Sequence, residues 1–186
     1  IFQTPTDLFL YQQLIFKSRP NVIIETGVAK GGSVLFACQM LDLIYGRSGI
    51  RNWSVVCCDI NPMIEAQQLI KQHGYEEKVL NLGPIDVKHS PFIYSISDAL
   101  FLPTLLESFT ATYPEAMIMQ KPILTSKLDF AQNICKDDQN ILHHKQYHMF
   151  QILLIYKQQN HEFHRRTQNS SNKDGFYRVC ANDHSL

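Results

Sequence analysis

Apolar residues along the first part of the chain follow two alternating spacings. Helical spacing predicts a helix over about 6–18, and the short apolar run "NVIIE" predicts a buried strand after it. A glycine-bearing turn then leads into "VLFACQMLDLIY", which predicts a helix that begins with Ser33 as N-cap and stops near Gly46. "WSVVCCDI" has the pattern of the next buried strand. This order predicts one βαβ unit of a doubly wound parallel sheet.

The same alternation continues to about residue 138. It predicts further helices in "NPMIEAQQLIKQHGYEEK", "SPFIYSISDA", "YPEAMIMQ" and "LDFAQNICK", and strands in "KVLNLGPI", "ALFLPT" and "PILTS". We predict that the strands near 22–25, 54–58, 98–103 and 122–126 are parallel, because helix-length sequence separates each from the next. The expected fold class is α/β, with pieces of a Rossmann-like parallel sheet and flanking helices.

The pattern weakens after about Asn140. Six of the eight histidines lie in the last 46 residues, which are rich in Gln, Asn and Lys. His143, His144 and His148 offer a metal ion two imidazoles at i, i+4, but no acidic residue falls at helical spacing beside them. We therefore expect no metal site, and a poorly structured or disordered tail over 141–186.

Composition and charge narrow the class of protein. Seventeen basic and seventeen acidic residues cancel, so no charge excess points to nucleic acid as a partner. The five cysteines form no C-x-x-C pair, and the adjacent Cys57 and Cys58 would point to opposite faces of a strand, so we expect reduced packing thiols. The longest apolar run, "MFQILLIY", is shorter than the ~20 residues of a membrane helix.

Two expectations concern the setting of the chain. Without a basic and apolar leader, we expect a cytoplasmic protein, either free or peripheral to the inner face of the membrane. Because the chain begins at Ile1 within patterned sequence, we expect a fragment or a processed product.

The glycine loop after the first strand is a candidate ligand site. Gly27, Gly31 and Gly32 lack the β-carbon that would keep a ligand from the backbone, and the amides of the next helix face the loop. Asp59 ends the next strand, where a carboxylate can accept hydrogen bonds from a ribose diol. A loop that uses glycine only to turn would explain the same residues, but the combination favours a nucleotide-like ligand.

A family resemblance is carried by "TPTDLFLYQQLIFKSRPNVIIETGVAKGGSVLFACQMLDLI" with "VVCCDI" after it. This stretch resembles the start of the cephalosporin hydroxylase family of methyltransferase-like proteins, often associated with O-methylation of surface sugars. The likeness covers about residues 3–62 and implies S-adenosylmethionine as the cofactor. The residues implied to contact it are Glu25, Gly27, Gly31, Gly32, Ser33 and Asp59.

A second candidate site lies in "LLESFTATYPEAM", which places Glu107 and Glu115 eight residues apart. Thr112 and Glu115 match a T-x-x-E capping box, which would give Glu115 a structural role without any ligand. Glu107 follows an apolar strand at the carboxyl edge of a parallel sheet, where ligands of α/β proteins gather. The start of the next helix offers amides to a diphosphate.

The run "FIYSISDALFLPTLLESFTATYPEAMIMQKPILTSKLDFAQNI" resembles the C-terminal donor domain of group 1, GT-B-fold retaining glycosyltransferases. The likeness extends over about 78–138 and includes the E-x7-E spacing, "EAM" and "KPILTS". It implies a UDP- or GDP-linked sugar donor and a glycan or lipid-linked glycan acceptor. It also implies that Glu107, the catalytic candidate, lies by the donor sugar and that Glu115 binds the nucleotide ribose. The other residues implied to bind the donor nucleotide are Ser108, Phe109 and Thr110.

The sequence thus divides into a methyltransferase-like segment over 1–62, a junction helix over 63–77, a glycosyltransferase-like segment over 78–140 and the tail. The leading hypothesis is a transferase that moves a sugar from a nucleotide donor in polysaccharide biosynthesis, with its acceptor domain missing. One alternative is a methyltransferase-like protein that binds S-adenosylmethionine. The other is a non-catalytic chimeric remnant that binds at most a nucleotide.

Overall fold

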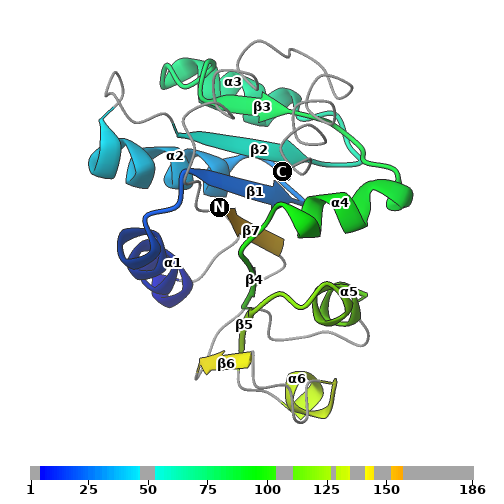
Figure 1. Ribbon diagram of the computed structural model, residues 1–186. Helices are drawn as coiled ribbons and strands as arrows, with labels where there is room; N and C mark the ends of the chain where they lie inside the picture. Colours follow the sequence, from blue (N-terminus) through cyan, green and yellow to red (C-terminus); the bar gives the residue numbers. More distant parts are fainter. Residues whose placement is uncertain are drawn as a thin grey trace, which may run out of the picture.

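The computed structural model describes residues 5–46, 53–103, 111–126, 129–134, 141–144 and 152–156, which form a seven-stranded sheet and its flanking helices (Figure 1). The strands are β1 Val22–Thr26, β2 Ser54–Cys58, β3 Val79–Asn81, β4 Ala99–Leu102, β5 Ile123–Ser126, β6 Ile141–His144 and β7 Ile152–Tyr156. The helices are α1 Pro5–Ser18, α2 Gly32–Tyr45, α3 Ile64–Gln72, the short 3-10 helix η1 Val87–His89, α4 Ser90–Ser95, α5 Thr112–Ile118 and α6 Asp129–Ile134.

The strands lie in the order β3-β2-β1-β7-β4-β5-β6. β1, β2 and β3 are parallel to one another, and so are β4, β5 and β6. β7 lies between β1 and β4 and is antiparallel to both, so β1 and β4 run in the same direction. The predicted α/β fold and the predicted parallel direction of the four strands are confirmed.

β6 and β7 fall within the segment 141–186, which we predicted to be a poorly structured tail. β7, "ILLIY", is a continuous apolar run of the kind found in buried strands, although the sequence reading used it only to exclude a membrane helix. His143 and His144 lie in β6, so the helical spacing considered for a metal site does not apply to them. His148 and the rest of the tail outside these two strands lie outside the described residues.

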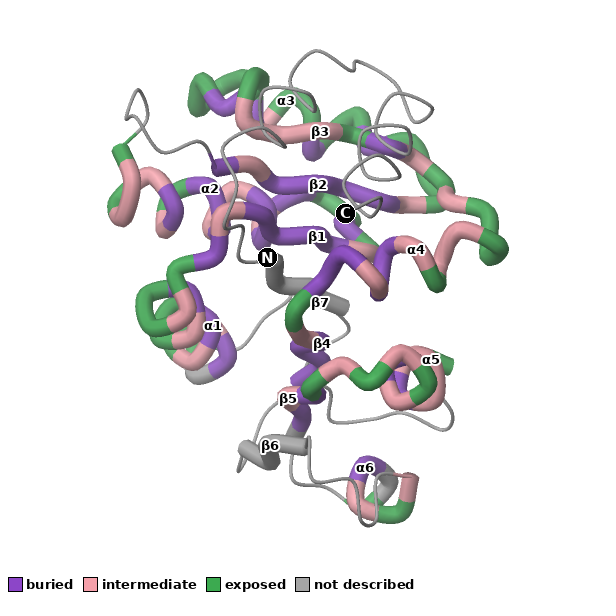
Figure 2. Tube along the Cα trace, viewed as in Figure 1, coloured by how far each residue is buried: buried purple, intermediate pink, exposed green. Residues whose placement is uncertain are grey.

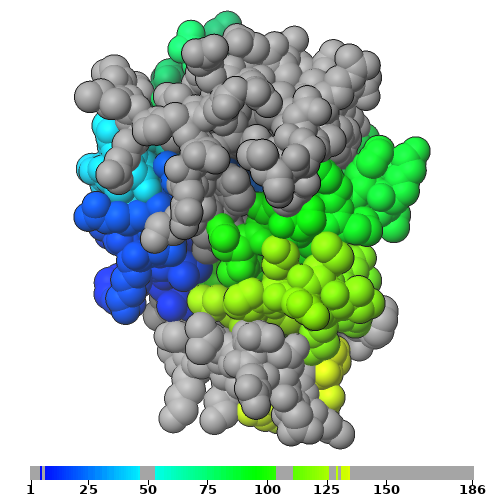
Figure 3. Space-filling view, in the orientation of Figure 1, coloured from blue at the N-terminus to red at the C-terminus, as the bar shows by residue number. Residues whose placement is uncertain are grey.

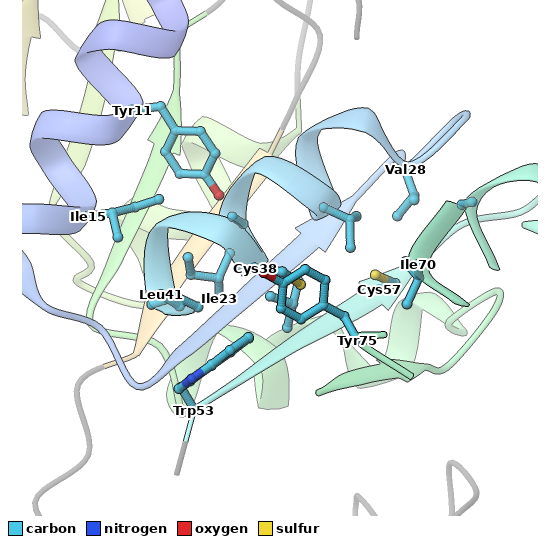
Figure 4. Close-up of a cluster of buried hydrophobic side chains, with 14 of the residues drawn as sticks. Tyr11, Ile15, Ile23, Val28, Cys38, Leu41, Trp53, Cys57, Ile70 and Tyr75 are labelled. Atoms are coloured by element: carbon cyan, nitrogen blue, oxygen red, sulfur yellow. The ribbon is translucent and has the colours of Figure 1, made fainter. Parts of the chain in front are cut away.

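The two faces of the sheet carry separate cores because side chains alternate along each strand. α1, α2 and α3 pack on the face that holds Ile23, Val55 and Cys57 (Figure 4). α4, α5 and α6 pack on the face that holds Ile24 and Cys58. β1 and β2 are buried along most of their length (Figure 2).

The cysteine prediction is confirmed for the described residues. Cys57 and Cys58 belong to the cores on opposite faces of the sheet, and both are buried free thiols, as is Cys38. Cys135 and Cys180 lie outside the described residues. Among the helices that the structure describes, none is long and apolar enough to cross a membrane.

Two predicted helix caps are wrong. The N-cap of α2 is Gly31, in the left-handed conformation at φ 77° and ψ 10°, and Ser33 lies inside the first turn. The N-cap of α5 is Ala111, and this helix start has no side-chain cap hydrogen bond. Thr112 is therefore not the N-cap that the predicted capping box requires, because α5 begins one residue earlier than the motif predicts.

Candidate functional site

A cavity of about 350 Å³ opens at the carboxyl ends of β1 and β2. In doubly wound sheets this edge is where ligands bind. The lining residues from β1, β2 and the turns after them are Thr26, Gly27, Cys58, Asp59 and Ile60. Those from the later part of the chain are Pro84, Ile85, Ser90, Ile93, Tyr94, Thr112 and Glu115. The cavity thus combines residues from the two sites that the sequence placed in separate segments.

The cavity lies on the side of the sheet that α4 and α5 cover. Ile93 and Tyr94 of α4 line it and pack in the same core as Tyr113 of α5. In the space-filling view the surfaces of α4, in green, and of α5, in yellow-green, adjoin on one face of the molecule (Figure 3). The short helices α4 and α5 therefore form one wall of the cavity, to which they contribute Tyr94 and Glu115.

Gly27 leaves the backbone open toward the cavity. Its φ is 77°, and an added β-carbon would meet no heavy atom within 4 Å. Its backbone amide donates to the carbonyl of Cys58 at 3.0 Å, which joins the ends of β1 and β2. Of the predicted loop glycines, Gly27 is the one that lines the cavity.

Gly31 has a different reason to be glycine. A β-carbon there would lie 2.6 Å from Cβ and 2.8 Å from Cα of Ala66, so α3 packs directly against the bare backbone. Neither Gly31 nor Gly32 lines the cavity. Close packing of α2 on α3 therefore accounts for Gly31 without a ligand.

Glu25 and Ser33 lie away from the cavity. The hydroxyl of Ser33 donates to Oε1 of Glu25 at 2.6 Å, and both side chains are buried. Burial, followed by the charge of Glu25, raises the pKa of Tyr11, which belongs to the core on the α1 to α3 side. Glu25 thus faces that core and ties β1 to the first turn of α2, and its contact with a cofactor stays a prediction.

Asp59 fixes the glycine loop and lines the cavity. Its Oδ2 accepts a hydrogen bond from the amide of Ala29 at 3.1 Å, and its Oδ1 accepts one from the amide of Asn61 at 2.8 Å. A carboxylate can accept about four hydrogen bonds, so these two leave room for a ligand. The side chain is half-buried at the end of β2, which is the position expected of a ribose-binding acid.

Glu115 lines the cavity next to Tyr94, a residue that the sequence reading missed. Burial, then the charge of Glu115 and a hydrogen bond to it, raises the pKa of Tyr94 above its ordinary value of 10.0. The Tyr94 hydroxyl also lies 3.4 Å from the carbonyl oxygen of Thr112, so its single proton is shared between this carbonyl and the Glu115 carboxylate. The signal that could have pointed to Tyr94 was its polar tip at the end of the otherwise apolar run "PFIY".

The remaining predicted site residues lie outside the described part of the chain. These residues are Glu107, Ser108, Phe109 and Thr110, and their roles stay predictions. Within the described ranges, no group of three His, Cys, Asp or Glu side chains is placed to hold a metal ion.

Comparisons with known proteins give two overlapping family matches. A family described as rhamnosyl O-methyltransferase/CmcI matches residues 1–88, and the family of glycosyl transferases group 1 matches residues 49–172. Both resemblances drawn from the sequence are therefore confirmed. The overlap, 49–88, includes Asp59 and Ile85, two of the residues that line the cavity.

Two individual proteins are also similar to the chain. A mannosylglucosyl-3-phosphoglycerate synthase from Petrotoga mobilis is 28% identical over 145 residues, which are 75% of this chain and 27% of that protein. The chain thus spans about a quarter of the length of this relative. The crystal structure of a putative caffeoyl-CoA O-methyltransferase from Staphylococcus aureus has a TM-score of 0.44 at 18% identity and covers 64% of this chain and 53% of that one. Because the second family match covers more than half of the chain, the chain belongs to the family of glycosyl transferases group 1.

Proposed function

We propose that the cavity binds the nucleotide of a nucleotide-sugar donor and that the chain supplies donor-binding residues for glycosyl transfer. The observation that carries this proposal is the position of Glu115, a half-buried carboxylate that lines the cavity next to Tyr94. Family membership supports the reaction class. The name of the Petrotoga relative, a synthase of a sugar-bearing product, agrees with it.

The chemistry of the cavity suits a nucleoside. Carboxylate oxygens of Glu115 can accept charge-assisted hydrogen bonds from a ribose diol. Tyr94 is protonated near neutral pH, and its raised pKa extends this to higher pH, so its hydroxyl can hold the Glu115 carboxylate by donating to it. The apolar side chains of Ile60, Ile85 and Ile93 supply the kind of wall on which a flat base packs.

The finer points of the proposal concern residues and molecules beyond the cavity. Glu107 would lie by the donor sugar, and the backbone amides of Ser108, Phe109 and Thr110 would face the diphosphate. The donor would carry UDP or GDP, and the acceptor would be a glycan or a lipid-linked glycan in polysaccharide biosynthesis. We place this reaction in the cytoplasm, with no nucleic acid as partner.

A second candidate function is binding of S-adenosylmethionine, as in methyltransferase-like proteins. It is favoured by the match over residues 1–88 and by the presence of Gly27 and Asp59 in the cavity. Asp59 would take the ribose of this cofactor. A remnant that binds a nucleotide without turnover is the third candidate, and measured turnover would exclude it.

The test of the donor site is calorimetric titration of the chain with UDP and with GDP, repeated for Glu115→Gln. We expect the substitution to weaken binding by ~1.5 to 3 kcal/mol, because it removes the charge that strengthens the hydrogen bonds to the diol. The Tm should hardly change, since glutamine keeps an oxygen that can accept from Tyr94. Glu77→Gln, at an exposed position outside the cavity, is the matched control and should leave binding intact.

The proposal fails in two ways that this titration separates. If neither UDP nor GDP released or absorbed heat with the unchanged chain, the cavity would not be a donor site. Binding in the unchanged chain, with equal affinity in Glu115→Gln, would show that the nucleotide is held elsewhere.

A further inference from the structure

We propose that the chain has one nucleoside site in place of two, so that S-adenosylmethionine and a nucleoside diphosphate compete for it and Asp59 and Glu115 act on the same ligand. This inference rests on the proposed nucleotide binding in the cavity. It differs from what the two family resemblances imply, since each assigns its own carboxylate to its own ligand.

The size of the cavity is the first argument. Asp59 at the end of β2 and Glu115 in α5 both line the same space of about 350 Å³. Cavities that enclose small organic ligands have volumes of roughly 300–1,000 Å³, so this one is near the lower limit for a single ligand. Two nucleosides side by side would not fit.

The continuity of the sheet is the second argument. β7 lies between β1 and β4, and neighbouring strands are spaced by 4.7–4.9 Å, so β1 and β4 are roughly 9–10 Å apart across one unbroken sheet. The two segments therefore share one carboxyl edge. Tyr94 connects the part of the cavity near Asp59 with the part near Glu115. It lines the cavity with Asp59 and also hydrogen-bonds to Glu115.

The chemistry of the ligands is the third argument. S-adenosylmethionine and nucleoside diphosphates both contain a ribose with two neighbouring hydroxyl groups, which are two hydrogen-bond donors. Asp59 already accepts from the amides of Ala29 and Asn61, and Glu115 accepts from Tyr94. A ribose diol in the cavity can give each carboxylate a further donor. Either ligand would then occupy the position that the other needs.

The experiment is a displacement titration on the full chain with UDP and S-adenosylhomocysteine. We expect the apparent Kd of UDP to rise about elevenfold when S-adenosylhomocysteine is present at ten times its own Kd, which is the factor for exclusive binding. We also expect Asp59→Asn and Glu115→Gln each to weaken both ligands by about tenfold or more. Asp86→Asn is the control, because Asp86 also accepts a backbone amide, that of Lys88 at 3.1 Å, but does not line the cavity.

The outcomes separate this inference from the proposed function. Binding of UDP that is unaffected by S-adenosylhomocysteine would overturn the single site and leave the donor site in place. The same holds if Asp59→Asn changes the affinity for S-adenosylhomocysteine alone. Binding of neither UDP nor GDP would overturn both. The displacement titration needs no substituted chain, so a folding defect in Asp59→Asn cannot hide the answer.

Discussion

Gly27 and Gly31 have the same φ of 77°, yet the chain uses them for different purposes. At Gly27 the space around a β-carbon is open, whereas at Gly31 the backbone of α3 fills it. A loop of three glycines therefore contains one position that faces the cavity and one that permits helix packing. Sequence alone treats them alike, because the difference depends on α3, more than thirty residues away along the chain.

The first prediction compares alanine at these two positions. Gly27→Ala should lower the free energy of unfolding by ~1–2 kcal/mol, the usual cost of a left-handed backbone for a residue with a β-carbon. Gly31→Ala adds a contact of 2.6 Å with Cβ of Ala66, and overpacking of this kind costs a further ~1–3 kcal/mol. Urea unfolding of both variants measures the difference. Equal losses would mean that α3 does not pack against Gly31.

Glu25 shows which part of a site the sequence can predict. Residues 23 and 25 share one face of β1 because side chains alternate, so the common face of Ile23 and Glu25 follows from the pattern. Which helices cover that face does not follow from local sequence. The cavity lies on the other face, with Cys58, so Glu25 and its partner Ser33 do not line it, whereas Gly27 and Asp59 of the same predicted group do.

At the scale of elements, α5 is fastened to the sheet by a chain of two hydrogen bonds. The hydroxyls of Tyr113 and Thr125 are 2.5 Å apart, and Oγ1 of Thr125 lies 3.0 Å from the carbonyl of Leu102, to which it donates. Tyr113 and Thr125 are both buried. This link joins α5, β5 and the end of β4, and so it holds Glu115 at the cavity.

The second prediction tests that link with a double-mutant cycle of Tyr113→Phe and Thr125→Val. Each change alone should lower the free energy of unfolding, and the coupling between the two should be about 0.5–1.5 kcal/mol, the usual net contribution of one buried hydrogen bond. The cycle is measured by urea unfolding of the parent, both single variants and the double variant. Simple additivity would show that the two hydroxyls do not depend on each other.

Most helices and strands can be predicted from local periodicity, but the order in which the strands pair in the sheet cannot. The apolar runs of β1, β2, β4 and β5 and the helices between them were predicted, because each pattern is complete within about ten residues. β7 was not predicted, although its apolar run is visible, because its pairing with β1 and β4 depends on residues distant in sequence. The cap of α5 was misplaced by one residue because Thr112 matches a capping motif that the backbone does not use.

For the whole molecule, one sheet holds two cores of different character. The core on the α1 to α3 side contains the buried Tyr11, Cys57 and Trp53, the single tryptophan of the chain. The rings of Tyr11 and Phe101 stack at 5.9 Å between centroids, so α1 is held against β4 as well as β1. In this core, burial disfavours the negatively charged forms of Tyr11 and Cys57.

Alkaline pH should therefore destabilise the folded chain. Burial, followed by the charge of Glu25, raises the pKa of Tyr11 well above its ordinary value of 10.0 and that of Cys57 well above 9.0. The unfolded chain releases these protons at the ordinary values, whereas the folded chain retains them. The folded state then binds more protons, so the free energy of unfolding is unaffected by these groups below pH 9.0 and falls as the pH rises past 9.0 and 10.0.

The last prediction assigns part of this loss to one side chain. Each group that titrates only in the unfolded chain lowers the free energy of unfolding by ~1.4 kcal/mol per pH unit above its ordinary pKa. Tyr11→Phe removes one such group and keeps the ring between Phe36 and Phe101, so its stability should decline less steeply above pH 10.0. Near neutral pH the variant should be at least as stable as the parent, because the Tyr11 hydroxyl is buried without a hydrogen-bond partner among the described residues. Urea unfolding followed by the fluorescence of Trp53 between pH 7 and 11 measures both effects. Parallel declines in parent and variant would contradict the prediction, since they would mean that Tyr11 ionises as readily in the folded chain as in the unfolded one.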